Sequence, residues 1–122
     1  MELRKGELHI WNYTFDQKDV EKEQLRPILS AEERSRANDF VYEKDAAKYI
    51  SNHVFRKQVL AKYLSIPAST VQYAYTHFGK PYLANANIHF SHTYRSNKAL
   101  LAIYLDATVG IDLEEIKTLQ DP

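Results

Sequence analysis

The feature that most constrains the fold is a long helical signal between about Asp45 and Leu64. One broad face of this stretch carries apolar residues at 3.6-residue spacing, namely Ala46, Ala47, Ile50, Val54, Leu60, Ala61 and Leu64. Phe55, Val59 and Tyr63 lie roughly opposite. We therefore expect a helix that is covered on two sides and that ends before Pro67.

Segments on both sides of this helix have the pattern of strands. Residues 7–15 are rich in aromatic and β-branched residues, and further strands are expected at 70–76, 88–92, 99–105 and 109–114. A strand, then helices, then several strands indicates an α+β fold, with helices packed on a small, mainly antiparallel sheet.

Two shorter helices are expected before the long one. Residues 17–25 have a helical pattern that ends before Pro27. Ser30 is followed three residues later by Glu33, which is the pattern of a capping box, so a helix should begin there.

Composition limits the class of protein. The 122 residues suffice for one domain, residues 1–122, and Lys+Arg and Asp+Glu both number 16, which does not support a nucleic-acid binder. No apolar run approaches the roughly 20 residues of a membrane-spanning helix, and the N-terminus lacks the apolar core of a signal peptide. Cysteine is absent, which excludes disulfides and thiolate chemistry. We expect a cytoplasmic protein with no nucleic-acid and no membrane partner.

Two carboxylates near the C-terminal end are candidate metal ligands. Asp112 and Glu114 are two residues apart in an expected strand, so their side chains share one face. Such a pair suits Mg²⁺, which takes one or two carboxylates and completes its shell with water and phosphate oxygens. A solvated strand face is the alternative.

Two other short segments suit a phosphate ligand. In "HFGKPYL" (77–83), Gly79 permits a tight turn and Lys80 can contact a phosphate, although an ordinary hairpin turn with a solvated lysine has the same pattern. In "IHFSHTY" (88–94), a strand that ended at Ser91 would let its hydroxyl and the His92 ring meet a phosphate together; a structural Ser-His pair is the alternative.

Histidines and basic residues leave further alternatives open. His89 and His92, with Asp112, could form a transition-metal site, but only if the segment were helical. Most basic residues around the helices are expected to be solvated or paired. Lys57 lies within the apolar stripe of the long helix and either extends to its edge or reaches into a groove.

The order and spacing of these motifs resemble one family. The run "LSAEERSRANDF", a helix ending "FRKQVLAKYL", and then "FGKPYL", "IHFSHT" and "VGIDLEEI" resemble the N-terminal half of the surfactin-synthetase-activating type of 4′-phosphopantetheinyl transferase. The resemblance covers about residues 29–116. It implies one half of a pseudo-twofold α+β fold, and Mg²⁺-dependent transfer of phosphopantetheine from coenzyme A (CoA) to a serine of an acyl or peptidyl carrier protein.

The resemblance also implies roles for individual residues. Asp112 and Glu114 match the Mg²⁺ ligands that hold the CoA diphosphate. Lys80 and His92, with the backbone near Ser91, would contact CoA phosphates, and Arg36, Lys44 and Lys48 would face the 3′-phosphate, with Arg56 as a further candidate. The implied CoA contacts are Arg36, Lys44, Lys48, Phe78, Gly79, Lys80, Pro81, Ser91 and His92.

The sequence departs from the family pattern in three places. Thr93 replaces a serine, and Glu33 stands where a basic phosphate contact is common. The helix of the second half, with its K-E-A motif, presumed base and further carboxylate, does not occur before Pro122. We therefore expect no catalytic base in this half, and a partner that is either a C-terminal half or a second copy in a homodimer. The alternative function is a non-catalytic CoA- or nucleotide-binding module, or an inactive fragment, that self-associates.

Overall fold

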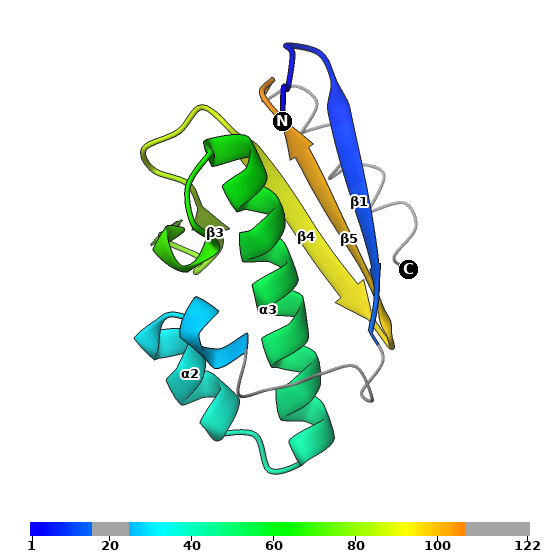
Figure 1. The fold of residues 1–122 in the computed structure, drawn as a ribbon, viewed down its shortest axis with the longest axis vertical. Coiled ribbons are helices and arrows are strands. Elements are labelled where there is room, and N and C mark those ends of the chain that lie inside the picture. Colours follow the sequence, from blue (N-terminus) through cyan, green and yellow to red (C-terminus); the bar gives the residue numbers. More distant parts are fainter. Residues whose placement is uncertain (16–24, 107–122) are drawn as a thin grey trace.

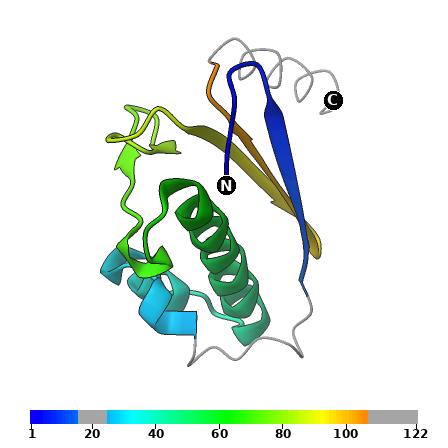
Figure 2. The ribbon, with the colours of Figure 1, turned by 45° about the horizontal axis from the view of Figure 1, so that its top comes forward.

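The computed structural model describes residues 1–15 and 25–106, which form an α+β fold (Figure 1). Strands β1 (Leu8–Thr14), β4 (His89–Arg95) and β5 (Lys98–Tyr104) form an antiparallel sheet in the order β1-β5-β4. Helix α3 (Glu43–Leu64) lies along one face of this sheet, as the turned view shows (Figure 2). The expected α+β class is confirmed.

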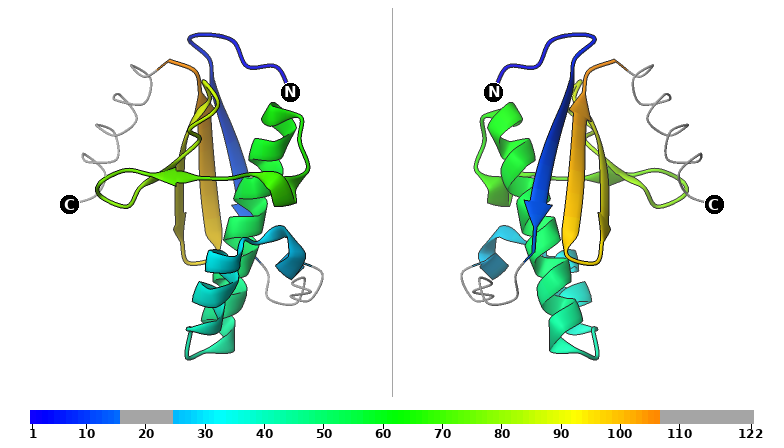
Figure 3. Two further views of the ribbon diagram at one scale, coloured as in Figure 1. Left: turned by 90° about the vertical axis from the view of Figure 1, so that its left-hand side faces the viewer. Right: turned by 90° about the vertical axis from the view of Figure 1, so that its right-hand side faces the viewer.

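A second layer of short elements covers the side of α3 away from the sheet. It consists of η2 (Arg26–Ile28), α2 (Ala31–Asn38) and η3 (Ala68–Thr70), seen beside α3 in both views of Figure 3. The expectation that the long helix is covered on two sides is therefore confirmed.

The buried apolar residues form two clusters, and α3 contributes to both. One cluster joins the C-terminal half of α3 to the sheet, with Leu60, Leu101 and Ile103 fully buried. A second cluster joins the N-terminal half of α3 to α2 and η2, and it contains Leu29, Ala37, Tyr49, Ile50 and Val54. Helix α3 thus contributes side chains to both clusters and links them.

The start of α2 and the end of α3 lie close to the positions that the sequence predicted. The Ser30 hydroxyl accepts a hydrogen bond from the Glu33 amide at 3.1 Å, and the Glu33 carboxylate accepts one from the Ser30 amide at 2.9 Å, so the capping box is confirmed. Helix α3 ends at Leu64, where Ser65 adopts a left-handed conformation (φ 56°) two residues before Pro67.

Two strand expectations need correction. Only Ala74–Tyr75 (β2) of the expected strand 70–76 is a strand, and it pairs with Pro81–Tyr82 (β3). Thr70 instead ends η3, where its amide and hydroxyl both bond the Pro67 carbonyl, and Pro81 has no amide hydrogen to extend the ladder. The strand that begins at His89 runs to Arg95 because it pairs along its whole length with β5.

The expected helix at 17–25, apart from Leu25, and the expected strand at 109–114 lie outside the described residues. Within residues 1–15 and 25–106, no helix is both long enough and apolar enough to span a membrane.

The register of β5 predicts that replacement of two neighbouring leucines by alanine lowers stability by different amounts. Leu101 is fully buried, whereas Leu100 is 46% exposed on the other face of the sheet. We expect Leu101→Ala to lower the free energy of unfolding by about 3 kcal/mol, and Leu100→Ala by less than about 1 kcal/mol. Urea unfolding of both variants measures the difference, and equal losses would contradict the register.

Candidate functional site

A cleft of about 750 Å³ opens between α2, α3, the β2–β3 turn and strand β4. Its walls carry basic, acidic, aromatic and imidazole side chains. The lining residues are Glu32, Glu33, Ser35, Arg36, Asp39, Tyr49, His53, Arg56, Tyr75, Gly79, Pro81, His92 and Tyr94.

The cleft brings together four of the CoA contacts that the resemblance implied. Arg36 comes from the last turn of α2, Gly79 and Pro81 come from the β2–β3 turn, and His92 comes from β4. The chain between the first and last of them includes all of α3. Cationic, imidazole and turn groups from three separate segments therefore share one cavity.

The β2–β3 turn is tightly closed. The Thr76 amide donates to the Lys80 carbonyl at 2.9 Å, and the Thr76 hydroxyl accepts from the Lys80 amide at 3.0 Å. Gly79 has a φ of 82°, a conformation that favours glycine. The expected turn is confirmed. Lys80 is exposed within it, and Phe78 is 93% exposed.

Strand β4 separates Ser91 from His92. The His92 side chain lies on the α3 side of the sheet, where its ring is 6.3 Å from that of Phe55 and 5.5 Å from that of Tyr94. Ser91 is buried on the other face. The strand does not end at Ser91, so the hypothesis that the Ser91 hydroxyl and the His92 ring meet one phosphate is wrong.

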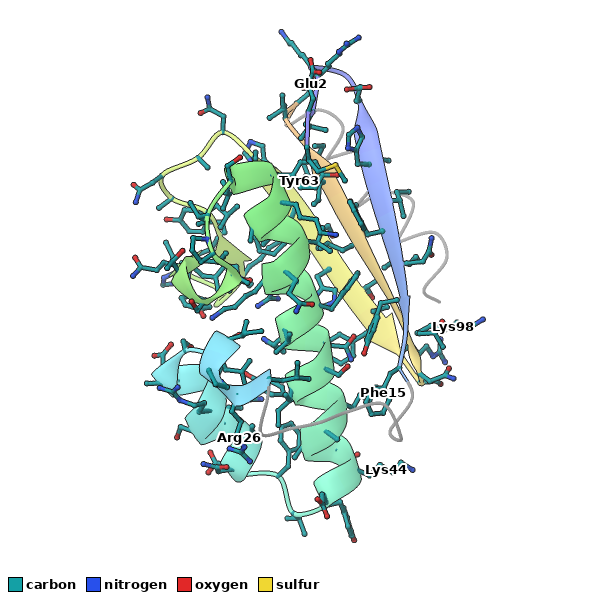
Figure 4. The ribbon with its side chains drawn as sticks, in the orientation of Figure 1. Glu2, Phe15, Arg26, Lys44, Tyr63 and Lys98 are labelled. Carbon is teal, nitrogen blue, oxygen red and sulfur yellow. The ribbon has the colours of Figure 1, made fainter. Side chains whose placement is uncertain are left out.

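Lys44 and Lys48 line a different hollow, of about 670 Å³, together with Phe15 and Asn97. Figure 4 shows Lys44 near the N-terminal end of α3. The Lys48 ammonium lies 5.9 Å from the centre of the Tyr94 ring, which also lines the cleft. The structure thus groups Arg36 with the cleft and leaves the two lysines in the neighbouring hollow.

A buried ion-pair network fixes α2 against α3. The Lys57 ammonium lies 2.5 Å from one Glu33 carboxylate oxygen, and the other oxygen is 2.9 Å from Nδ1 of His53. Lys57 is 1% exposed and also donates to the Ile28 carbonyl at 3.3 Å. Neither sequence expectation for Lys57 holds, since it reaches neither the edge of the helix nor an open groove but pairs with α2. Glu33 is part of this network.

The network shifts two pKa values. Burial raises the pKa of Glu33, but hydrogen bonds from His53, Lys57 and the Ser30 amide, with the attraction of Lys57, outweigh burial and hold it at about 2. Burial lowers the pKa of His53 below 6.5 and outweighs its bond to Glu33. Near neutral pH, Glu33 is a carboxylate and His53 is a neutral ring.

Arg56 lies beside this network on the cleft side. It is 7% exposed, its Nε donates to the Tyr73 hydroxyl at 3.0 Å, and its guanidinium carbon is 4.6 Å from the centre of the Tyr73 ring. The Phe90 ring is 5.5 Å away. The sequence offered Arg56 only as a further candidate. It gave no signal for His53, which lies one turn before Arg56 on α3, or for Tyr73, which meets Arg56 through tertiary packing.

The predicted magnesium ligands, Asp112 and Glu114, lie outside the described residues. Residues 1–15 and 25–106 contain no group of three or more His, Asp or Glu side chains that could hold a metal ion. His89 and His92 are three apart on a strand and point to opposite faces, so the transition-metal alternative built on both rings is wrong.

The pKa of Glu33 predicts how stability depends on pH. Because the folded value of about 2 lies below the ordinary 4.5, the stabilisation is complete above about pH 4.5 and is lost as the pH falls toward 2. Glu33→Gln should lower stability at pH 7 and flatten this acid-side slope. Urea unfolding at pH 7, 4.5 and 3 measures both effects.

The control is Glu32→Gln, an exposed neighbour on the same helix that takes no part in the network. It should keep the wild-type pH dependence. An unchanged slope in Glu33→Gln would contradict the network.

The sequence of this chain is similar to known proteins of one family. Residues 14–102 match the model of the N-terminal region of 4′-phosphopantetheinyl transferases. The 4′-phosphopantetheinyl transferase HetI of Nostoc sp. is 28% identical over 98% of this chain and 52% of its own length. The 4′-phosphopantetheinyl transferase psf-1 of Bacillus pumilus is 30% identical over 85% of this chain and 46% of its own length.

A mammalian relative matches as well. The mouse L-aminoadipate-semialdehyde dehydrogenase-phosphopantetheinyl transferase is 29% identical over 70% of this chain and 29% of its own length. The chain thus spans about half the length of the bacterial relatives, and less of the mammalian one.

Proposed function

The chain belongs to the 4′-phosphopantetheinyl transferase family, and from this premise we propose that it is the N-terminal lobe of such an enzyme and binds CoA. In the proposed reaction, the phosphopantetheine arm of CoA passes to a serine of an acyl or peptidyl carrier protein, and 3′,5′-ADP leaves. The carrier serine is the nucleophile, so the chain itself needs none.

The observation that carries this proposal is the convergence of Arg36, Gly79, Pro81 and His92 on one cleft. These are residues for which the motif order implied CoA contacts, and they come from separate parts of the chain. A guanidinium, an imidazole and a glycine turn in one cavity suit a phosphorylated ligand, because each can donate hydrogen bonds to phosphate oxygens.

The proposed role of these residues is positioning and charge neutralisation, which supply most of the catalysis in phosphoryl-type transfer. Arg36 and His92 hold phosphate oxygens on two sides of the cleft, and Lys80 adds a positive charge at the turn. When bound, Mg²⁺ would neutralise the charge on the CoA diphosphate, and Asp112 and Glu114 are the proposed ligands.

Direct titration with CoA tests the proposal. We expect binding to the chain in the presence of Mg²⁺, and about tenfold weaker binding for Arg36→Gln and for His92→Gln, which corresponds to the loss of one good phosphate contact each. Calorimetry measures the affinities. Arg34→Gln is the matched control, because Arg34 lies on the same helix but does not line the cleft. The absence of CoA binding with and without Mg²⁺ would contradict the proposal.

Transfer is tested by adding an apo carrier protein. With a C-terminal half of a family member present, the carrier should gain the mass of phosphopantetheine, and Asp112→Asn with Glu114→Gln should abolish the gain. Unmodified carrier in the reconstituted reaction, with CoA bound, would leave a non-catalytic CoA-binding module as the function.

The exposed face of the sheet favours self-association, which is part of the alternative function as a non-catalytic CoA-binding module. Leu8, Ile10 and Leu100 are 39%, 54% and 46% exposed on the sheet face away from α3. Exposed apolar side chains on neighbouring strands are typical of contact surfaces. We propose that this face contacts a second lobe, either a C-terminal half or another copy of the chain.

Sedimentation tests whether this face of the sheet forms a dimer contact. The chain should dimerise at high concentration, and Ile10→Lys should shift it toward the monomer, whereas Thr14→Lys near the end of the same strand should have a smaller effect. A wild-type monomer over the whole concentration range would contradict a homodimer.

A further inference from the structure

Arg56 is a buried arginine in the wall of the cleft. It is 7% exposed. No salt bridge joins it to a carboxylate within residues 1–15 and 25–106. The nearby Glu33 carboxylate is already bound on both oxygens, by Lys57 and by His53. A buried charge without a counterion is costly, which indicates that something else neutralises Arg56.

The hydrogen bonds of His53 limit what Arg56 can bond. Nδ1 of His53 lies 2.9 Å from a Glu33 carboxylate oxygen, and a carboxylate only accepts, so Nδ1 carries the proton and donates it to Glu33. The same nitrogen lies 3.3 Å from Nη2 of Arg56. Because Nδ1 has no lone pair left in this tautomer, it does not accept from Arg56. Among the described residues, the Nε bond to Tyr73 is then the one satisfied hydrogen bond of the guanidinium.

The side chain of Arg56 is held in position by aromatic rings before any ligand binds. The Tyr73 ring lies 4.6 Å from the guanidinium carbon, and the Phe90 ring lies 5.5 Å from it. Burial raises the pKa of Tyr73 to about 12, so its hydroxyl stays protonated and the Nε contact is kept over the physiological range. A planar fork of donors held in place by two aromatic rings suits bidentate recognition of a phosphate.

Arg56 faces the same cleft as Arg36, from the opposite helix. Arg36 extends from α2 and Arg56 from α3, and both line the cavity together with His92. Glu32 and Asp39 also line it, so the cleft is not uniformly positive. An anion that enters it would therefore be directed to the two guanidinium groups rather than held by a general positive field.

We infer that Arg56 is a phosphate-binding residue, whose Nη donors bind a phosphate group of the ligand in the cleft and, with Arg36, hold it from two helices. The inference rests on the proposed function for the identity of the ligand. The phosphate is either the terminal monoester of CoA or part of its diphosphate. Both present the same oxygen acceptors, and dephospho-CoA, which lacks the monoester, separates them.

The test compares Arg56→Met and Arg56→Lys with the wild type, titrated calorimetrically with CoA and with dephospho-CoA. We expect Arg56→Met to weaken CoA binding at least tenfold and Arg56→Lys to weaken it less, because lysine keeps the charge but loses the fork. Loss for CoA alone assigns the monoester, and loss for both ligands assigns the diphosphate. Arg34→Met, on an exposed arginine outside the cleft, should stay within twofold of the wild type.

Thermal unfolding gives a second readout that does not depend on CoA. In phosphate-free buffer, Arg56→Met should be at least as stable as the wild type, because it removes an uncompensated buried charge. Inorganic phosphate should raise the melting temperature of the wild type but not that of Arg56→Met. A variant with lower stability and unchanged affinity for both ligands would assign Arg56 a purely structural role and overturn the inference.

A substitution at Tyr73, whose ring contacts Arg56, tests the inference if Arg56→Met fails to fold. Tyr73→Phe keeps the charge and the stacking but removes the Nε acceptor, and it should weaken CoA binding several-fold. Unchanged binding by both Tyr73→Phe and Arg56→Lys would then overturn the inference. If the wild type binds no CoA but phosphate still stabilises it through Arg56, the proposed function fails and the phosphate site stands.

Discussion

The ion pair between Glu33 and Lys57 is the interaction on which the rest of the site depends. It joins the first turn of α2 to the middle of α3 at 2.5 Å, and both side chains are almost fully buried. Removing one partner of such a pair leaves a buried charge and commonly costs about 3–5 kcal/mol. The same carboxylate completes the capping box of α2. One side chain therefore sets where α2 begins and how it packs on α3.

This arrangement determines the shape of the cleft. With α2 fixed by Glu33, the residue three positions on, Arg36, lies on the cleft wall. His53 is held by the other Glu33 oxygen, and in the resulting tautomer it does not accept a hydrogen bond from Arg56, which lines the cavity. The Glu33 carboxylate thus organises the cationic and imidazole side chains around it.

The sequence predicted much of the frame because its signals are local. The apolar stripes of α3, the capping box at Ser30 and the turn at Gly79 depend on neighbouring residues, and each was confirmed. The strand at 70–76 was largely wrong, since the side chain of Thr70 closes a turn that competes with extension. The length of β4 was underestimated because β5 supplies its hydrogen bonds.

The site was predictable only in part. Arg36, Gly79, Pro81 and His92 could be named from motifs, but nothing in the sequence says that Lys44 and Lys48 line a different hollow. The burial of Lys57 was missed because a lysine in an apolar stripe usually extends to the helix edge. The contacts of Arg56 with Tyr73 and Phe90 join residues 17 and 34 positions away in the chain, and such contacts have no sequence periodicity.

The measurement that tests the central claim most directly is an amide chemical-shift titration with CoA in the presence of Mg²⁺. If the cleft binds the ligand, the largest shifts should fall on Arg36, Gly79 and His92, with little change at Asn97 in the neighbouring hollow. Shifts centred on Asn97 and Lys48, or no shifts at all, would contradict the account.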